Sequence, residues 1–333
     1  MPSILTLVRK TSVALMALLV LTGCTQQAGE DGLLDAMASV SGEGPAAAYF
    51  EYGEPAWWRD LGVDAGSGGD RRWLPAAVSG LGSLGAAWQT LPQATGMAPA
   101  TGTRAISIGV PPQQAFRFDG DVDSDAVRTK LTALGAKPRT MGGHEGLSFS
   151  PGAEIDLSRL IVPGLTNQLN QVVVTDSLAA AASTPGPLEA VLGGERTLAD
   201  NPAHAAVAAC LGDVAAATIM APSPSGAVTL YGVGLRRPAS LDDRPVNVIC
   251  VLPSAPAAAD VERALTSRLT PEGKMRDGGT YGTYAPEIAH DRITSDDHVV
   301  LRAVLTLSGT KTVMFANQML VRNELQGLIN SSR

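Results

Sequence analysis

The chain has 333 residues, of which 45% are hydrophobic but only 4% aromatic, and its formal net charge is −7. This length suits one large domain or two of ordinary size, with a core of Ala, Val and Leu rather than of large rings. An acidic chain without a run of Lys and Arg is a poor polyanion binder, which argues against nucleic acid as a partner.

The N-terminus has the features of an export signal. Two basic residues precede an apolar run, Val13 to Leu21, that is far shorter than the roughly 20 residues needed to span a bilayer. The run closes with Leu21-Thr22-Gly23-Cys24, which resembles the lipobox of bacterial lipoproteins. The resemblance implies that residues 1–23 are a signal peptide and that Cys24 carries a diacylglyceryl group. The alternative is an ordinary secretory signal in which Cys24 is incidental.

A lipobox places the mature chain on the extracytoplasmic face of the cell membrane. The acidic body would be repelled by anionic lipid headgroups, so the two acyl chains on Cys24 must hold it to the bilayer. Residues 24–44 are then expected to form a largely polar tether, with a short helix from Leu33 to Val40 near its end. A buried strand is predicted at 46–52, and Pro55 is a plausible first residue of a helix.

Four tryptophans lie in the N-terminal third of the chain. They share no local motif, so we expect them to fill the core of a protein with few rings; a Trp-lined ligand pocket is the alternative. They are Trp57, Trp58, Trp73 and Trp88.

The remaining sequence suggests a duplicated β-α-β-β-α unit, one copy in an N-terminal half (45–195) and one in a C-terminal half (196–333). Each copy has an apolar strand, a helix, a Gly-Gly-x-x-Gly turn and further strands. In the first copy these are expected at 115–118, 124–134, 142–146, 147–150 and 171–175, with a helix from Asp176. In the second they are expected at 246–252, 257–269, 278–282, 283–285 and 299–307, followed by the segment 313–329. The order predicts an α+β fold of mainly antiparallel sheets with helices on one face.

The segment between the two copies has clear boundaries. Leu198-Ala199-Asp200-Asn201-Pro202 predicts a helix start, with Asp200 or Asn201 as cap and Pro202 in the first turn. That helix should run over 202–211 and end at Gly212. Two strands, 213–220 and 227–236, should then pair as a hairpin. This arrangement gives the body a loose resemblance to uncharacterised surface-anchored proteins of high-GC Gram-positive bacteria, a class that implies no particular chemistry.

Export also bears on the two remaining cysteines, Cys210 and Cys250. In an oxidising compartment a single pair permits one connectivity, so we predict a disulfide that closes a loop of about 40 residues. The alternative is two buried free thiols that behave as small hydrophobes.

The polar motifs predict little chemistry. Asp119, Asp121 and Asp123 offer carboxylates for calcium, but an EF-hand loop starting at Asp119 would need Gly and Glu where Ser124 and Lys130 stand. Acidic residues that cap the following helix are the better interpretation. The histidines show no metal-binding spacing, and only His144, in a Gly-rich turn, is a weak candidate. Ser308-Gly309-Thr310-Lys311 matches Ser-x-x-Lys but lacks the companion motifs, and is expected to be a polar turn between two strands.

These observations favour a membrane-anchored, non-enzymatic binding or accessory module of the cell envelope. No cofactor and no metal are expected, and the partner would be another envelope protein or a small apolar ligand. An envelope hydrolase and a purely structural surface protein are the alternatives. A pocket with convergent polar groups would favour an enzyme, and a deep apolar cavity would favour ligand binding.

Overall fold

A computed structural model of the protein describes residues 32–63, 71–157, 160–222, 226–295 and 297–330. Cys24 and the rest of the lipobox lie outside the described residues. Within the described ranges no helix is both long and apolar enough to cross a membrane. Within the segment expected to be a tether, helix α1 (Gly32–Ala38) buries Leu33, Ala36 and Met37 in the core. Apolar side chains at helical spacing explain why residues from Gly32 onward belong to the folded body.

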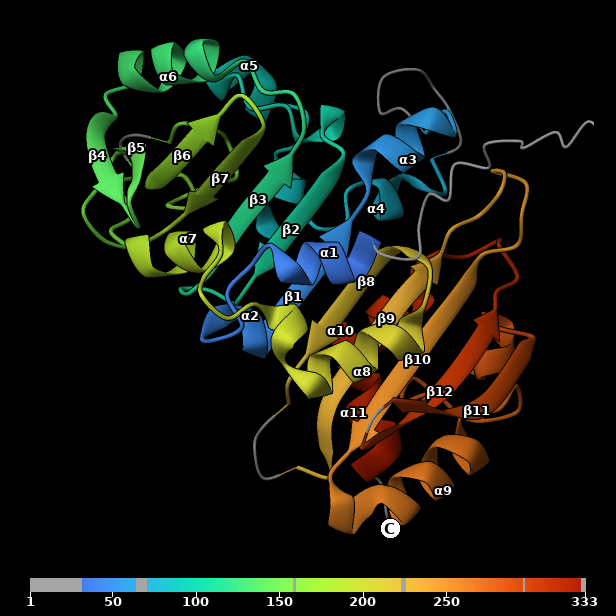
Figure 1. Ribbon diagram of the computed structural model, residues 1–333. Helices are drawn as coiled ribbons and strands as arrows, with labels where there is room; N and C mark the ends of the chain where they lie inside the picture. Colours follow the sequence, from blue (N-terminus) through green and yellow to red (C-terminus); the bar gives the residue numbers. More distant parts are fainter. Residues whose placement is uncertain (1–31, 64–70, 158–159, 223–225, 296, 331–333) are drawn as a thin grey trace, which may run out of the picture.

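The described strands form one antiparallel sheet that runs through the whole molecule (Figure 1). Its order is β11-β12-β10-β9-β8-β1-β2-β3-β7-β6-β5-β4, so the two halves of the chain share a continuous sheet in which β1 pairs with β8. The strands are β1 (Tyr49–Gly53), β2 (Arg104–Ile108), β3 (Ala115–Asp119), β4 (Lys137–Met141), β5 (His144–Ser148), β6 (Gln171–Thr175), β7 (Leu178–Ala182), β8 (Val214–Met220), β9 (Val228–Arg236), β10 (Val246–Pro253), β11 (Glu287–Ser295) and β12 (His298–Thr306).

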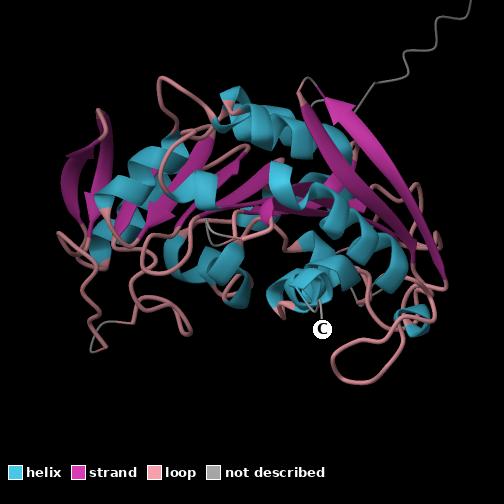
Figure 2. Cartoon of the chain, turned by 90° about the horizontal axis from the view of Figure 1, so that it is seen from below, coloured by secondary structure: helices cyan, strands magenta, loops and turns pink. Residues whose placement is uncertain are grey.

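Helices cover both faces of this sheet rather than one, which corrects the predicted arrangement (Figure 2). Alternate residues of a strand point to opposite faces, so each strand contributes to two apolar clusters. On one face lie α1, α2 (Pro45–Ala48), α7 (Pro185–Leu192) and α8 (Pro202–Leu211). The opposite face is covered by α5 (Leu91–Thr95) and α6 (Ser124–Ala133) in the first half and by α9 (Ala258–Arg268), α10 (Phe315–Val321) and α11 (Glu324–Asn330) in the second.

Further short helices lie between these elements. Four of them, α3, α4, η2 and η4, have proline in the first turn, where its missing N–H costs nothing. The bounds are α3 (Pro55–Asp60), α4 (Leu74–Ala77), η1 (Gly82–Ala86), η2 (Pro99–Thr101), η3 (Leu198–Asp200), η4 (Ala255–Ala257) and η5 (Tyr281–Thr283).

The predicted α+β class and its mainly antiparallel pairing are confirmed. The segment between the predicted copies also folds as expected. The Asn201 side chain accepts hydrogen bonds from the N–H groups of Ala203 and His204, and α8 ends at Gly212, whose φ of 68° suits glycine. Strands β8 and β9 pair as the predicted hairpin.

Several predicted elements were wrong. Residues 178–182 form strand β7 instead of a helix, because tertiary pairing with β3 and β6 overrides the helical preference of Leu-Ala-Ala-Ala-Ala. The predicted strand 46–52 begins as helix α2, and the predicted strand 283–285 lies in and just after η5. Strands β2, β4 and β11 were missed.

The predicted duplication is not confirmed. Gly142 and Gly143 lie in the hairpin turn between β4 and β5 rather than between a helix and a strand. The two apolar runs thought equivalent also differ, because 172–175 belongs to strand β6 whereas 313–317 leads into and begins α10. In each half, however, a strand leads into a helix and the helix into an antiparallel meander. The last strand of that meander pairs with the strand that precedes the helix, β7 with β3 in the first half and β12 with β10 in the second. That meander has four strands in the first half and two in the second.

A disulfide joins Cys210 on α8 to Cys250 on β10, with Cα atoms 6.1 Å apart. Both residues are fully buried in the cluster formed by α1, α7, α8 and the sheet. The bond therefore fixes α8 to the C-terminal half of the sheet.

We predict that replacing both cysteines by alanine lowers the free energy of unfolding by about 4 kcal/mol, because the loop between residues 40 apart in sequence is no longer closed in the unfolded chain. Denaturant unfolding of the oxidised protein, the reduced protein and the double variant would measure this. The reduced protein and the double variant should agree; equal stability of all three would show that the bond contributes nothing.

Polar side chains lie side by side in the middle of the sheet, on the face that carries α10. Glu51, in the middle of β1, lies opposite Ser107 on β2 and Thr218 on β8. Its carboxyl accepts hydrogen bonds from the Gly80 N–H (2.9 Å) and the Tyr49 hydroxyl (3.2 Å). Burial raises the pKa of Glu51 above its ordinary value, and these two donors oppose the rise.

This pKa shift predicts a pH dependence of stability. As the pH rises through the ordinary range of a carboxyl, the unfolded chain loses the Glu51 proton while the folded protein keeps it, so the free energy of unfolding falls. Glu51→Gln should therefore be more stable than the wild type at about pH 7 and nearly equal to it at about pH 4. Thermal melts across this range would test it, with the exposed Glu145→Gln as control. A stability difference that does not change with pH would contradict the account.

Candidate functional site

The three aspartates considered for calcium have other roles or lie apart. Asp119 forms ion pairs with Arg104 and Arg117, the second at 2.6 Å. Asp123 is the N-cap of α6 and accepts from the Ala126 N–H at 2.9 Å, as the capping interpretation predicted. Asp121 is exposed. Across the described ranges no group of three His, Cys, Asp or Glu residues could hold a metal ion.

The histidines and the Ser-x-x-Lys match are also dispersed. His144 is exposed at the start of β5, whereas His204 is buried and its Nε2 lies 3.1 Å from the Ala47 carbonyl oxygen. Burial lowers the pKa of His204, which favours the neutral ring. Ser308 contacts the Thr310 hydroxyl, while the Lys311 ammonium lies over the Tyr284 ring. This turn connects β12 to a helix rather than two strands.

The tryptophans support the core, and one of them also lines a cavity. Trp58 and Trp73 are fully buried and stack with their ring centroids 5.5 Å apart. Trp57 is partly buried beneath the Arg237 guanidinium. Trp58 and Trp73 are therefore core residues as expected, and Trp88 packs against the core and also lines an apolar pocket.

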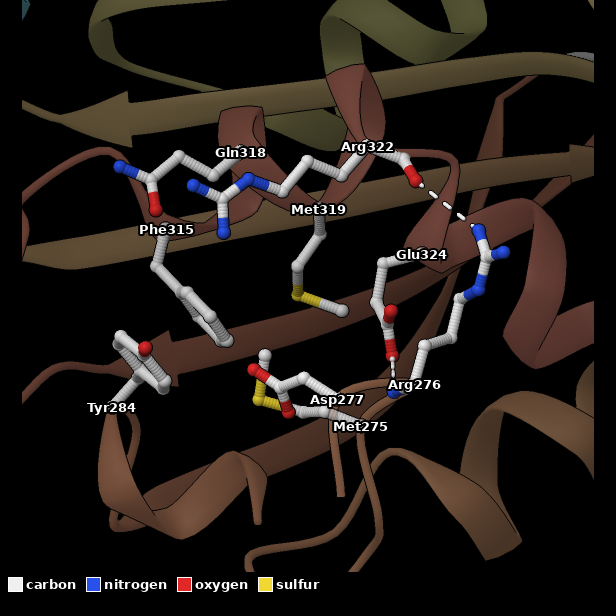
Figure 3. A pocket seen from close by; sticks show the side chains of 9 residues that line it. All are labelled: Met275, Arg276, Asp277, Tyr284, Phe315, Gln318, Met319, Arg322 and Glu324. Carbon is white, nitrogen blue, oxygen red and sulfur yellow. Dashed lines mark hydrogen bonds between the residues drawn. The ribbon is translucent and has the colours of Figure 1, made fainter. Parts of the chain in front are cut away.

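One pocket in the described part of the chain lies between α10, the start of α11 and the loop that follows α9 (Figure 3). Its volume is about 350 Å³, within the range usual for small-molecule sites. Its lining combines apolar and charged side chains: Met275, Arg276, Asp277, Tyr284, Phe315, Gln318, Met319, Arg322 and Glu324.

The floor of the pocket consists of aromatic rings and methionine side chains. Tyr284 and Phe315 stack with ring centroids 4.4 Å apart and planes 5° from parallel. Met275 and Met319 extend beside Phe315 (Figure 3). Methionine side chains are flexible and polarisable, so this floor can adapt to apolar groups of different shape.

Glu324 fixes the loop that forms one wall. This side chain is buried, and its Oε1 accepts hydrogen bonds from the Arg276 backbone N–H and the Tyr281 hydroxyl, both at 3.0 Å. Burial and the neighbouring carboxylate raise the pKa of Tyr281, so its hydroxyl stays a donor. The Arg276 guanidinium in turn donates to the Arg322 carbonyl at 3.4 Å. The wall is thus held to α11 by a buried acceptor.

Opposite charges face each other across the apolar floor. The Arg322 side chain extends over one side of the pocket and the Asp277 carboxylate lies on the other, with Phe315 and Met319 between them (Figure 3). Both residues are exposed, and the described residues form no ion pair with either side chain. One Asp277 oxygen accepts from the Gly279 N–H at 2.9 Å. Apart from Arg276 and Glu324, which make the hydrogen bonds of the wall, the site offers the Arg322 guanidinium and the Asp277 carboxylate to a molecule that rests on its floor.

Sequence reasoning did not find these residues. They come from two segments about 40 residues apart, 275–284 and 315–324, and each segment on its own looks like an ordinary surface stretch. The nearest signal was the glycine turn at 278–282, which lies in the wall, where Gly278 has a φ of 87°. Only the packing of α10 against the loop brings the charges together.

No protein-family model matches the sequence, and no curated protein matches it. The solved structures similar to it include crystal forms of TP0453. Form III has a TM-score of 0.37 and 7% identity and covers 82% of this chain and 94% of that chain. Form IV has a TM-score of 0.38 and 8% identity, and it covers 87% of this chain and 99% of that chain. Form I has a TM-score of 0.35 and 10% identity, and it covers 81% of this chain and 92% of that chain. At these values the likeness says nothing about what the chain binds.

Proposed function

We propose that this protein is a lipid-anchored, extracytoplasmic binding module, and that its ligand site is the pocket of Figure 3. The lipobox supports the location, because it would attach the mature N-terminus to the outer leaflet of the cell membrane through Cys24. The pocket supports binding, because it combines an apolar floor with a few convergent polar groups.

We infer the chemical class of the ligand from the pair of charges on opposite sides of the floor. The Arg322 guanidinium can form two parallel hydrogen bonds with a carboxylate or phosphate, and Asp277 can accept from an ammonium group. Phe315, Tyr284 and the two methionines can hold an apolar group between them. The ligand is accordingly a small zwitterion with an apolar substituent, such as a short peptide fragment with free ends.

The dipeptide Leu-Phe, which has both charges and two apolar side chains, is a direct probe. We predict that it binds the full-length protein in phosphatidylcholine nanodiscs, measured by isothermal titration calorimetry. Arg322→Gln and Asp277→Asn should each weaken binding by about tenfold, since each removes one charge-assisted contact of roughly 1.4 kcal/mol.

The exposed pair Arg263 and Asp260 on α9 provides matched controls. Arg263→Gln and Asp260→Asn make the same chemical changes away from the pocket and should leave binding unchanged. N-acetylated Leu-Phe should lose sensitivity to Asp277→Asn, and the C-terminal amide should lose sensitivity to Arg322→Gln. Absence of binding, or equal effects of pocket and control variants, would refute the assignment of this site.

Anchoring is tested separately. Cys24→Ala should abolish incorporation of labelled lipid in a bacterial host and leave either an unprocessed precursor or a released protein, because no other residue accepts the diacylglyceryl group. Membrane fractionation with mass determination of the chain would measure this. A processed chain that still sediments with membranes would show that the lipobox interpretation is wrong.

A further inference from the structure

A second pocket, distinct from the one in Figure 3, lies in the N-terminal half among short helices. It has a volume of about 210 Å³, and most of its lining is apolar. The lining residues come from α3, α4, η2 and the turns next to them: Pro55, Arg59, Val63, Leu74, Ala77, Val78, Leu81, Trp88, Ala100 and Thr101.

The local architecture explains why this space is not filled. Helices α3 and α4 have six and four residues, and each carries proline in its first turn. Helices this short cannot form a continuous ridge that interlocks with a neighbour. At Ala77 and Ala100 the side chains that face the space are single methyl groups, while Trp88 contributes a flat indole to the lining.

This pocket has few polar groups, and its charged group is a cation. Arg59 is the charged residue of the lining, and it is exposed. One guanidinium nitrogen donates to the Ala100 carbonyl at 3.0 Å, and no carboxylate among the described residues pairs with it. The Thr101 hydroxyl is already used, since it donates to the Ala98 carbonyl at 2.8 Å. A ligand would thus meet an apolar surface with a single cationic group at the Arg59 position.

From this combination we propose that the pocket binds an amphiphile with one alkyl chain and an anionic headgroup, as in a fatty acid. The chain lies along Leu81, Val78 and the Trp88 indole, and the carboxylate accepts hydrogen bonds from the free N–H groups of Arg59. Apolar surface drives insertion of the chain, and the planar guanidinium matches a carboxylate. This inference does not depend on the zwitterion site.

Trp88 allows a direct test, because bromine quenches an indole that it touches. The full-length protein in phosphatidylcholine nanodiscs is titrated with ω-bromododecanoate, and the fluorescence that Trp88→Phe removes is taken as the Trp88 signal. We expect saturable quenching of this signal. Arg59→Gln should weaken the affinity for ω-bromododecanoate by about tenfold. Ala77→Phe should abolish the quenching, because the larger side chain fills the pocket.

Matched controls are Arg263→Gln and Ala259→Phe, at exposed positions of α9, which should leave quenching unchanged. Uncharged ω-bromododecanol should bind with equal affinity to the wild type and Arg59→Gln. Nanodiscs of dibromo-phosphatidylcholine without added fatty acid distinguish the source of the chain: quenching there assigns it to a bilayer lipid, and no quenching assigns it to a free fatty acid.

Three outcomes would overturn the proposal. They are no quenching by either brominated compound, equal quenching in Ala77→Phe with an unchanged melting temperature, and equal affinity of the wild type and Arg59→Gln for the anionic probe. If Ala77→Phe does not fold, the Arg59 comparison decides, because its exposed side chain can be replaced without disturbing the core.

Discussion

The pairing of β1 with β8 is the contact on which the whole architecture depends. Each half has its own meander, and this ladder, from Tyr49 opposite Met220 to Gly53 opposite Ala216, makes them one sheet. An apolar cluster with residues of both halves covers one face of that sheet. Next to the ladder, the small side chains of Ala215 and Ala216 on β8 belong to the same apolar cluster as the buried rings of Trp58 and Trp73. Backbones also approach closely here, because a Cβ at Gly53 would lie 2.1 Å from the Ser79 carbonyl oxygen. The polar contacts of Glu51 are tolerated in this place because each is satisfied by a neighbour.

The same sheet determines where ligands can enter. Helices cover both faces, and two pockets lie where the packing of these helices is interrupted. One interruption lies between α10 and the loop after α9, where Glu324 holds the wall in place. The other lies among the short helices near α3. Both openings are therefore consequences of helix lengths and loop positions, one in each half of the chain.

Sequence reasoning succeeded where the signal was local. The Asn201 cap, the end of α8 at Gly212 and the β8–β9 hairpin each follow from residues within a few positions of one another. It failed where distant contacts decide. Leu178 to Ala182 has the composition of a helix, and only its two strand neighbours make it β7. The charges of the candidate site were equally hidden, because Asp277 and Arg322 become neighbours of one cavity only in the folded chain.

The most direct test of a small-molecule binding module is to ask what the protein holds in its own cell. Native mass spectrometry of the full-length protein, isolated in nanodiscs from its host membranes, would measure this. The account predicts a small adduct that contains both a cationic and an anionic group. The adduct should be absent from the Asp277→Asn, Arg322→Gln double variant and present in the Asp260→Asn, Arg263→Gln double variant. A protein without a zwitterionic adduct, or one whose zwitterionic adduct survives loss of both pocket charges, would contradict the assignment of this site.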